Sequence, residues 1–349
     1  MERTSFTALV STIILVLSVA FSSFAFQKDI LFEKEDPMDL ELVTNLKSLK
    51  GSKSDTIFFS TFIKFKNASG MADSVPVDLR ARGNSRRAQC FFPPIWLKIP
   101  NGAAKNTPFH GNRSLKLVLP CQEGQYYNDL ITKEYIIYKL YEGISPYYFR
   151  TRMIKLALTD RQGKKNKTYN LNAFVIEDVD NVAENYEAKG VKSGLIYPHL
   201  VNDTLALTQD FFSFMIGNTD WSNATQHNVR MLDLGEDKYV PVSYDFDNSG
   251  FVNAPYAKPY DYLPIENVTE RLYRGICRNQ ELTQWVRTDF LQREAKILEI
   301  MDRYQNDLPH SEFESARNYL VEFFEILRND TSFESQMISN CQKYNFIEN

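Results

Sequence analysis

Four oxygen-bearing side chains in the middle of the chain have the types and order of a phosphate and metal site. In chain order they are Asp220, Asn228, Asp245 and Asp247. Magnesium prefers hard oxygen ligands in a near-octahedral shell. In phosphotransferases one Asp orients the attacking hydroxyl, while an Asn and a second Asp hold the metal that bridges the nucleotide phosphates. The order of these residues is therefore typical of phosphoryl transfer.

A β-hairpin is expected to bring two of these side chains together. Residues 228–234 alternate like a strand, residues 238–243 are suited to be its partner, and residues 235–237 supply the turn. Asn228 would begin the first strand, and Asp245 would follow the second. Because the outer ends of a hairpin meet, we expect Asn228 and Asp245 to be neighbours in space.

The same residues have two other interpretations. Asp220 and Asn228 could each cap a helix or an Asx turn. Residues 245–250 match the first half of a calcium loop, Asp-x-Asp-x-Ser-Gly, although its twelfth position is Tyr256. Tyrosine cannot supply the bidentate carboxylate that such a loop needs. A phosphate and metal site, a structural calcium site and a turn without a ligand are therefore the three alternatives.

Two blocks of sequence resemble the CotH-like group of secreted and spore-coat kinases, in particular its exported bacterial members. The first block has Gly-Asn-Thr-Asp-Trp at residues 217–221, His-Asn at 227–228 and Tyr-Asp-Phe-Asp-Asn-Ser-Gly at 244–250. The second has Arg-Gly-Asn-Ser at 82–85, followed by Trp-Leu-Lys-Ile at 96–99. The resemblance covers residues 75–260. Members of this group usually carry several lysines in the strand that contains residues 96–99, where this chain has only Lys98. The chain also has no Gly-rich phosphate loop, which is a departure from ordinary protein kinases.

The resemblance implies an ATP-dependent phosphotransferase (a CotH-like kinase) that uses Mg²⁺ or Mn²⁺ and acts on a protein or glycan hydroxyl. It makes Asp220 the catalytic base. The implied metal ligands are Asn228, Asp245 and Asp247.

The implied nucleotide contacts come from the N-terminal half of the chain. Lys98 is the candidate for pairing the phosphates, because it ends an apolar strand, and Lys116 and Lys155 compete with it for that role. Glu177 is placed where a kinase hinge would be. Further candidates have two readings each: Arg80, Arg82 and Arg86 contact phosphate or pair with acidic neighbours, and Glu134 pairs with the lysine or faces solvent.

The periodicity of apolar residues predicts the elements that must position these side chains. Strands are expected over residues 56–65, 75–82, 95–99, 114–119, 152–159 and 168–176, with a helix over 129–141 that Gly143 ends. Helices are expected over residues 205–216, 268–277, 280–304, 311–328 and 333–344. We therefore expect an α+β, two-lobed, protein-kinase-like fold, with a strand-rich N-terminal lobe over 55–180 and a helical C-terminal lobe over 181–349.

The N-terminus has the features of a signal peptide over residues 1–25. Arg3 precedes an apolar run over residues 8–21, and the small residues Ser23 and Ala25 suit a signal peptidase. We expect cleavage after Ala25, with an uncleaved anchor as the alternative, then a linker over residues 26–54. The protein would be secreted or periplasmic. No later segment is apolar for long enough to cross a membrane, and a net charge of -4 gives no sign of a nucleic-acid partner.

An exported protein can form disulfides, and this chain has an even number of cysteines. The pairings nearest in sequence are Cys90–Cys121 and Cys277–Cys341. Three connectivities are possible, and four free thiols are the alternative. We expect any disulfide to stay within one half of the chain.

Two functions from different classes are open at this point. The first is the extracytoplasmic ATP-dependent phosphotransferase. The second is a catalytically inactive, kinase-like envelope or surface protein that binds a partner or a structural calcium ion.

Overall fold

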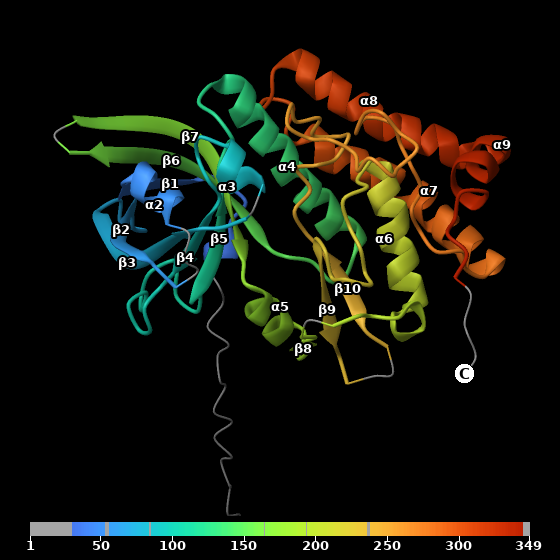
Figure 1. Ribbon diagram of the computed structural model, residues 1–349, viewed down its shortest axis with the longest axis horizontal. Coiled ribbons are helices and arrows are strands. Elements are labelled where there is room, and N and C mark those ends of the chain that lie inside the picture. Colours follow the sequence, from blue (N-terminus) through green and yellow to red (C-terminus); the bar gives the residue numbers. More distant parts are fainter. Residues whose placement is uncertain are drawn as a thin grey trace, which may run out of the picture.

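Seven strands of the computed structural model close into a barrel (Figure 1). The structure describes residues 30–52, 56–83, 85–163, 165–192, 194–235 and 238–344, so the predicted signal peptide lies outside it. The barrel strands are β1 (Met38–Thr44), β2 (Phe59–Lys66), β3 (Ala72–Ala81), β4 (Ile95–Lys98), β5 (Ser114–Val118), β6 (Thr151–Gln162) and β7 (Lys165–Glu177). Their order around the barrel is β1-β2-β3-β4-β5-β7-β6.

The expectation of a two-lobed, protein-kinase-like fold is wrong, because the sheet closes on itself. The closing strand is β1, which lies in the segment expected to be a linker. It pairs antiparallel with β2 on one side and parallel with β6 on the other, from Met38 opposite Ile154 to Thr44 opposite Asp160. All other neighbouring pairs are antiparallel. The result is a mixed barrel with helices packed beside it.

The barrel interior is filled by every second residue of its strands. In β1 the side chains of Met38, Leu40 and Leu42 are buried, while Asp39 and Glu41 between them are exposed. Successive side chains of a strand point to opposite faces of the sheet, so this alternation fixes which residues enter the core. Strand β1 was not predicted, whereas the five strand regions predicted before residue 160, and the one over 168–176, form strands close to their expected bounds.

Helix α4 (Gln125–Ile144) lies between the barrel and the C-terminal helices (Figure 1). It packs against β7 on one side and α7 (Gln280–Asp302) on the other. Gly143 does not end this helix as expected but lies inside it. A Cβ atom at Gly143 would come within 2.5 Å of Ile300 Cδ1, so the missing side chain lets α7 approach closely.

The second half of the chain adds a small sheet and a helical layer. Its three antiparallel strands are β8 (Lys189–Gly190), β9 (Val229–Asp233) and β10 (Val240–Ser243). The principal helices are α6 (Asp203–Met215), α7 and α8 (His310–Arg328). Their apolar faces meet α4 in one continuous core that includes Phe211, Phe290 and Phe323.

The remaining helical elements are short. They are α1 (Ile30–Glu33), α2 (Leu46–Gly51), α3 (Ser85–Gln89), α5 (Val179–Asn185), the 3-10 helix η1 (Pro198–Leu200), α9 (Asp330–Phe333) and the π-helix η2 (Glu334–Ile338). The helix expected over residues 268–277 does not form. Its chain is irregular and joins the C-terminus through a bridge between Ile276 and Gln342.

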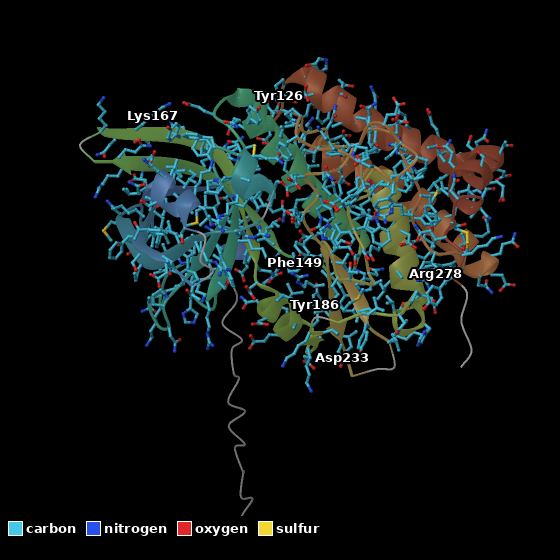
Figure 2. All side chains as sticks on the ribbon, viewed as in Figure 1. Tyr126, Phe149, Lys167, Tyr186, Asp233 and Arg278 are labelled. Carbon is cyan, nitrogen blue, oxygen red and sulfur yellow. A yellow bond between two sulfur atoms is a disulfide. The ribbon has the colours of Figure 1, made fainter. Side chains whose placement is uncertain are left out.

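The β6–β7 hairpin extends beyond the rest of the barrel, and Figure 2 places Lys167 on it. Its basic side chains include Arg161, Lys165 and Lys167, all exposed. No helix within the described ranges has the length and apolar character needed to cross a bilayer.

Candidate functional site

The predicted hairpin forms, and it brings Asn228 beside Asp245. Strands β9 and β10 pair antiparallel with Val229 opposite Ser243, and the Tyr244 amide extends the pairing by donating to the Asn228 carbonyl at 3.0 Å. Both site residues have left-handed backbone, with φ of 51° at Asn228 and 63° at Asp245. Asn and Asp adopt this conformation more readily than other non-glycine residues. Their identity therefore suits the backbone as well as the chemistry.

A cavity of about 480 Å³ collects the acidic side chains that the sequence singled out. Asp220, Asn228, Asp245 and Asp247 all line it, together with Arg82. The full lining consists of Arg82, Gly83, Arg86, Gln89, Pro94, Asp220, His227, Asn228, Asp245, Asp247, Asn248, Tyr256, Lys258 and Tyr260. The predicted convergence of Asp220, Asn228 and Asp245 in one cavity is thus confirmed, while their roles stay predictions.

Asp220 is held in place by three side chains. Tyr260 donates its hydroxyl hydrogen to Asp220 Oδ1 at 2.7 Å, and His227 Nε2 lies 2.8 Å from the same oxygen. The Asn228 amide nitrogen donates to the Asp220 backbone carbonyl at 2.8 Å and to Oδ2 at 3.2 Å. The carboxylate is therefore oriented toward the cavity by groups on both sides.

Asp245 and Asn228 offer oxygen atoms that suit a hard cation. The Asp245 carboxylate accepts no hydrogen bond from any residue that the structure describes; only its backbone amide is bonded, to the Tyr138 hydroxyl at 2.9 Å. Asn228 uses its amide nitrogen on Asp220, which leaves its side-chain oxygen without a protein donor in the described ranges. Together with Asp247, these two oxygen atoms would give Mg²⁺ a small number of protein ligands. Mg²⁺ typically takes only a few protein ligands when substrate phosphates complete its coordination shell.

Arg86 directly follows the Arg-Gly-Asn-Ser stretch of residues 82–85, and its guanidinium partly neutralises two carboxylates, Asp247 and Glu134. Its Nη1 atom lies 3.5 Å from Asp247 Oδ2 and 3.9 Å from Glu134 Oε2. Glu134 is 1% exposed, so it does not face solvent. Asn84 of the same stretch lies outside the described residues.

Burial and the charges of neighbouring carboxylates raise the pKa values of Glu134 and Asp247. Burial is the main cause that raises the pKa of Glu134 well above its usual range, and the charge of Asp247 adds to it while Arg86 opposes it. Burial also raises the pKa of Asp247, with a further contribution from Asp245 and opposition from Arg86. The charges of Tyr256, Asp247 and Glu134 raise the pKa of Arg86 despite its burial. Ionisable groups whose pKa values are perturbed by burial and by specific charge partners are common at functional sites.

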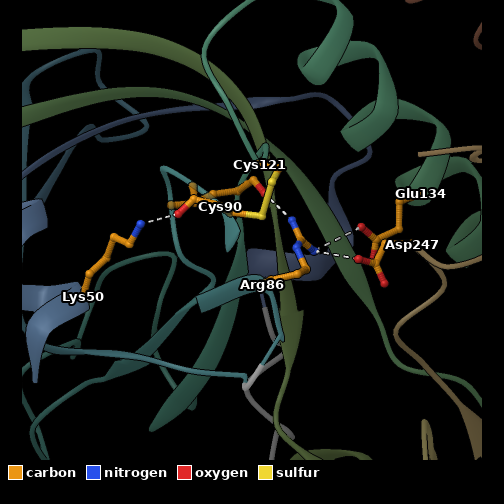
Figure 3. Close-up of a disulfide and its surroundings, with 7 residues drawn as sticks. Lys50, Arg86, Cys90, Cys121, Glu134 and Asp247 are labelled. Carbon is orange, nitrogen blue, oxygen red and sulfur yellow. Dashed lines mark hydrogen bonds and ion pairs between the residues drawn. A yellow bond between two sulfur atoms is a disulfide. The ribbon is translucent and has the colours of Figure 1, made fainter. Parts of the chain in front are cut away.

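A disulfide fixes the element that carries Arg86. Cys90 follows α3 directly and is bonded to Cys121, as Figure 3 shows. The Cys90 amide donates to the Arg86 carbonyl at 2.9 Å, and Arg86 Nη2 donates to the Leu119 carbonyl at 2.6 Å. Leu119 lies two residues before Cys121, so the disulfide holds in place both partners of the Arg86–Leu119 hydrogen bond. That hydrogen bond orients the Arg86 guanidinium toward Asp247 and Glu134.

Two predicted nucleotide contacts lie elsewhere. Lys98 is absent from the cavity lining; its ammonium sits 4.4 Å from the centre of the Phe58 ring and 5.4 Å from that of Trp96. Glu177 is also absent from the lining and is 1% exposed. Its carboxylate accepts from the Arg150 guanidinium at 2.7 Å and from the Arg150 amide at 2.6 Å, so it joins the adjoining ends of β6 and β7.

Lys116 on β5 does not line the cavity either, but it packs against Tyr244, the residue before Asp245. Its ammonium lies 4.1 Å from the centre of the Tyr244 ring and 5.2 Å from that of Phe149. Burial, then the charges of Arg82 and Arg230, lower the pKa of Lys116 to about 7, and Asp245 opposes them. Of the three lysines that the sequence proposed, this one is electrostatically coupled to the cavity.

Sequence reasoning missed the tyrosines of the irregular segment 253–262. Tyr256 donates to Asp247, and Tyr260 donates to Asp220. The signal was a repeated Pro-Tyr pair, at residues 255–256 and 259–260. Proline restricts the backbone and thereby favours an ordered but irregular segment.

Within the described ranges, no group of three or more His, Cys, Asp or Glu side chains is arranged to hold a metal ion by itself. A cation here would depend on Asp245, Asp247 and Asn228 together with oxygens of a bound substrate. No protein-family model matches the chain, and a search of curated proteins finds no match.

Proposed function

We propose that this protein is an extracytoplasmic ATP-dependent phosphotransferase of the CotH-like kind, which transfers phosphate to a protein or glycan hydroxyl. One observation carries the proposal: Asp220, Asn228, Asp245 and Asp247 line a single cavity with the cation Arg82. The fold differs from that of protein kinases, but chemistry belongs to sites rather than to folds. The export of the protein rests on the sequence of residues 1–25.

The residues divide into a base, metal ligands and phosphate contacts. Asp220 would accept the proton of the attacking hydroxyl, since its carboxylate is fixed at the cavity wall. Asn228, Asp245 and Asp247 would hold Mg²⁺ or Mn²⁺, which supplies positive charge against the phosphates. Arg82 would contact phosphate, because its guanidinium lines the cavity and makes no hydrogen bond or ion pair with the described residues.

Nucleotide-dependent thermal stabilisation tests the proposal. A ligand that binds only the folded state stabilises it, by about 2.7 kcal/mol at a concentration of 100 times Kd. We expect ATP with Mg²⁺ or Mn²⁺ to raise the melting temperature by several degrees. Arg82→Ala should reduce this rise.

The matched control for this test is Lys98→Ala, which removes the cation that the sequence suggested but that lies away from the cavity. It should leave the nucleotide-dependent rise unchanged. A wild-type protein that shows no shift with ATP and either metal, over millimolar concentrations, would sink the proposal.

The position of Arg86 favours a second candidate function, a catalytically inactive surface protein. Its guanidinium already neutralises Asp247 at 3.5 Å, where a cation would otherwise do so. Such a protein would bind a partner without nucleotide, or hold calcium in the Asp245–Gly250 turn. A melting temperature that rises with calcium alone, and not with ATP, would support this candidate.

A further inference from the structure

The segment 253–262 places a tyrosine hydroxyl on the candidate base. Tyr260 Oη donates to Asp220 Oδ1 at 2.7 Å and lies 3.4 Å from His227 Nε2. Its ring is stacked on Tyr262, with ring centres 5.5 Å apart and planes inclined by 15°. The side chain is 42% exposed, so a solvent-accessible residue extends over the cavity wall.

This contact has the geometry that a base makes with an acceptor. A general base must lie within about 2.6–3.2 Å of the oxygen whose proton it takes. Tyr260 meets this condition, whereas its two neighbours in the segment do not. Tyr256 donates to Asp247 instead, and Tyr262 is 70% exposed and makes its ring contact with Tyr260.

We propose that Tyr260 is an intramolecular phosphoryl acceptor, so that the protein phosphorylates its own segment 253–262. This inference rests on the proposed function, since it requires ATP in the cavity. In the step, Tyr260 Oη forms a bond to the γ-phosphorus of ATP, and the bond from that phosphorus to the β–γ bridging oxygen breaks. The Tyr260 proton passes to Asp220 Oδ1, and ADP leaves with the electron pair of the broken bond.

The environment of Tyr260 explains why a base is needed. Burial, then the hydrogen bond to Asp220, raise the pKa of Tyr260 to about 12. The hydroxyl is therefore protonated at neutral pH, and Asp220 must take the proton as the new bond forms. Both groups line the same cavity as the predicted metal ligands, so no long movement separates the acceptor from the phosphates.

The phosphorylated Tyr260 side chain would not fit the position against Asp220 that the unmodified side chain occupies. Phosphotyrosine carries about -1.5 to -2 charges at pH 7 and is repelled by nearby carboxylates. The phosphate would stand against Asp220, so Tyr260 would leave this oxygen and expose it. An external hydroxyl could then occupy the same place on the base.

Mass mapping of the full chain after incubation with ATP and Mn²⁺ tests the proposal. We expect one phosphate per chain on the peptide that contains Tyr260, none in Tyr260→Phe, and wild-type yield in Tyr262→Phe, the stacked neighbour. The fraction of chains phosphorylated per unit time should be independent of protein concentration, as an intramolecular reaction requires. The melting temperature of Tyr260→Phe shows whether that variant is folded.

A second readout does not depend on phosphoryl transfer. The ATP analogue fluorosulfonylbenzoyl adenosine carries an electrophile at its phosphate end, so it should label Tyr260 in wild type and ATP should suppress the label. Labelling confined to other residues counts against the proposal. Phosphate found only on other residues, or ADP formed while Tyr260 stays unmodified, overturns the inference but leaves the phosphotransferase intact. Failure of the wild type to bind ATP at all overturns both.

Discussion

Asp245 has opposite effects on the empty and the ligand-bound cavity. Without a ligand, its charge adds to the burial that raises the pKa of Asp247 and to the causes that raise the pKa of Glu134. Carboxylates that lie close together disfavour each other's charged form. With a metal and phosphates bound, the same carboxylate would neutralise the cation. Its net contribution to folding should therefore be small or unfavourable, and its contribution to turnover large.

We expect Asp245→Asn to lose nucleotide turnover while keeping its fold. The melting temperature without ligand should stay the same or rise slightly, because one of several crowded charges is removed. ATP hydrolysis or transfer should fall roughly 100-fold or more, the usual effect of losing one electrostatic stabiliser of the transition state.

Parallel measurement of melting temperature and turnover checks this prediction. Asp261→Asn removes an exposed carboxylate near the cavity and is the control. A structural calcium turn makes the reverse forecast, in which Asp245→Asn lowers the melting temperature in calcium and no turnover exists to be lost.

Lys116 gives the second prediction at this scale, a pH-dependent stability. Its pKa in the folded chain is about 7, against about 10.4 in an unfolded chain. Between these values the unfolded chain binds more protons, so the free energy of unfolding rises with pH. Lys116→Met removes this dependence. The variant should be the more stable protein at pH 6.5, and its advantage should shrink as pH rises toward 10.

Melting temperatures of both proteins across this range measure the difference, in which other titrating groups largely cancel. Lys155→Met, at an exposed lysine of β6, is the control for losing a strand lysine. An advantage of Lys116→Met that grows with pH would contradict the assignment.

The sequence predicted the acids of the cavity and Arg82, but it misplaced Lys98 and Glu177. Asn228 and Asp245 lie at the ends of β9 and β10, so local hairpin geometry was enough to join them. Asp220 follows α6, and its place beside them was predicted from the Asp–Asn–Asp order. The placement of Lys98 depends instead on how the barrel is oriented. It points outward beside Trp96, on a strand that contributes Leu97 to the interior, and no local pattern says what lies outside.

At the scale of elements, α6 is anchored to the irregular segment 273–278 through a buried carboxyl. Asp210 is 4% exposed, and burial raises its pKa to about 7 against the opposing charge of Arg278 and the Ile276 amide. Gly275 is needed here, since a Cβ atom would lie 2.4 Å from Tyr273 Oη and 2.6 Å from Asp210 Oδ2. The chain over residues 268–277, where a helix was expected, is therefore held against α6 in an irregular conformation.

We expect Asp210→Asn to stabilise the protein at alkaline but not at acidic pH. The folded chain holds a proton on Asp210 up to about pH 7, whereas the unfolded chain loses it near 3.9. The free energy of unfolding therefore falls as pH rises between these values. Asparagine mimics the protonated form, so the two melting temperatures should agree near pH 4 and separate by pH 8. Equal melting temperatures at pH 8 would show that Arg278 compensates the charge.

The strand that closes the barrel, β1, lies in a polar and charged segment that was expected to be a linker. Residues 38–42 alternate apolar and acidic side chains, which is the pattern of a strand with one face in water. The pattern predicts a strand but not its partners, and the parallel pairing with β6 joins residues more than a hundred positions apart. The antiparallel neighbours β6 and β7 were predictable because a short turn connects them.

At the scale of the whole molecule, the cavity exists only where distant parts of the chain meet. Arg82 and Arg86 come from the end of β3 and from α3, while the acids follow α6 and β10. The two disulfides follow the predicted pairings, Cys90–Cys121 and Cys277–Cys341, and each stays within one half of the chain. The first lies behind Arg86, and the second closes the bridge between Ile276 and Gln342.

The two disulfides should therefore contribute similarly to stability but differently to the cavity. They close loops of 31 and 64 residues, for which the loop-entropy model gives roughly 4 kcal/mol each. We expect Cys90→Ala/Cys121→Ala and Cys277→Ala/Cys341→Ala to lower the melting temperature by comparable amounts. Denaturant unfolding of the two double variants, compared with wild type, measures this.

Nucleotide affinity, measured well below both melting temperatures, should separate the two double variants. Loss of Cys90–Cys121 frees α3, so Arg86 is no longer aimed at Asp247 and Glu134 by the contacts to Leu119 and Cys90. The unpaired acids then repel each other and the phosphates, and Kd for ATP with Mn²⁺ should rise. Loss of Cys277–Cys341 leaves those contacts in place, so Kd should stay near the wild-type value. An equal rise of Kd in both variants would show that affinity follows overall stability, and that the bridge behind Arg86 has no specific effect on the cavity.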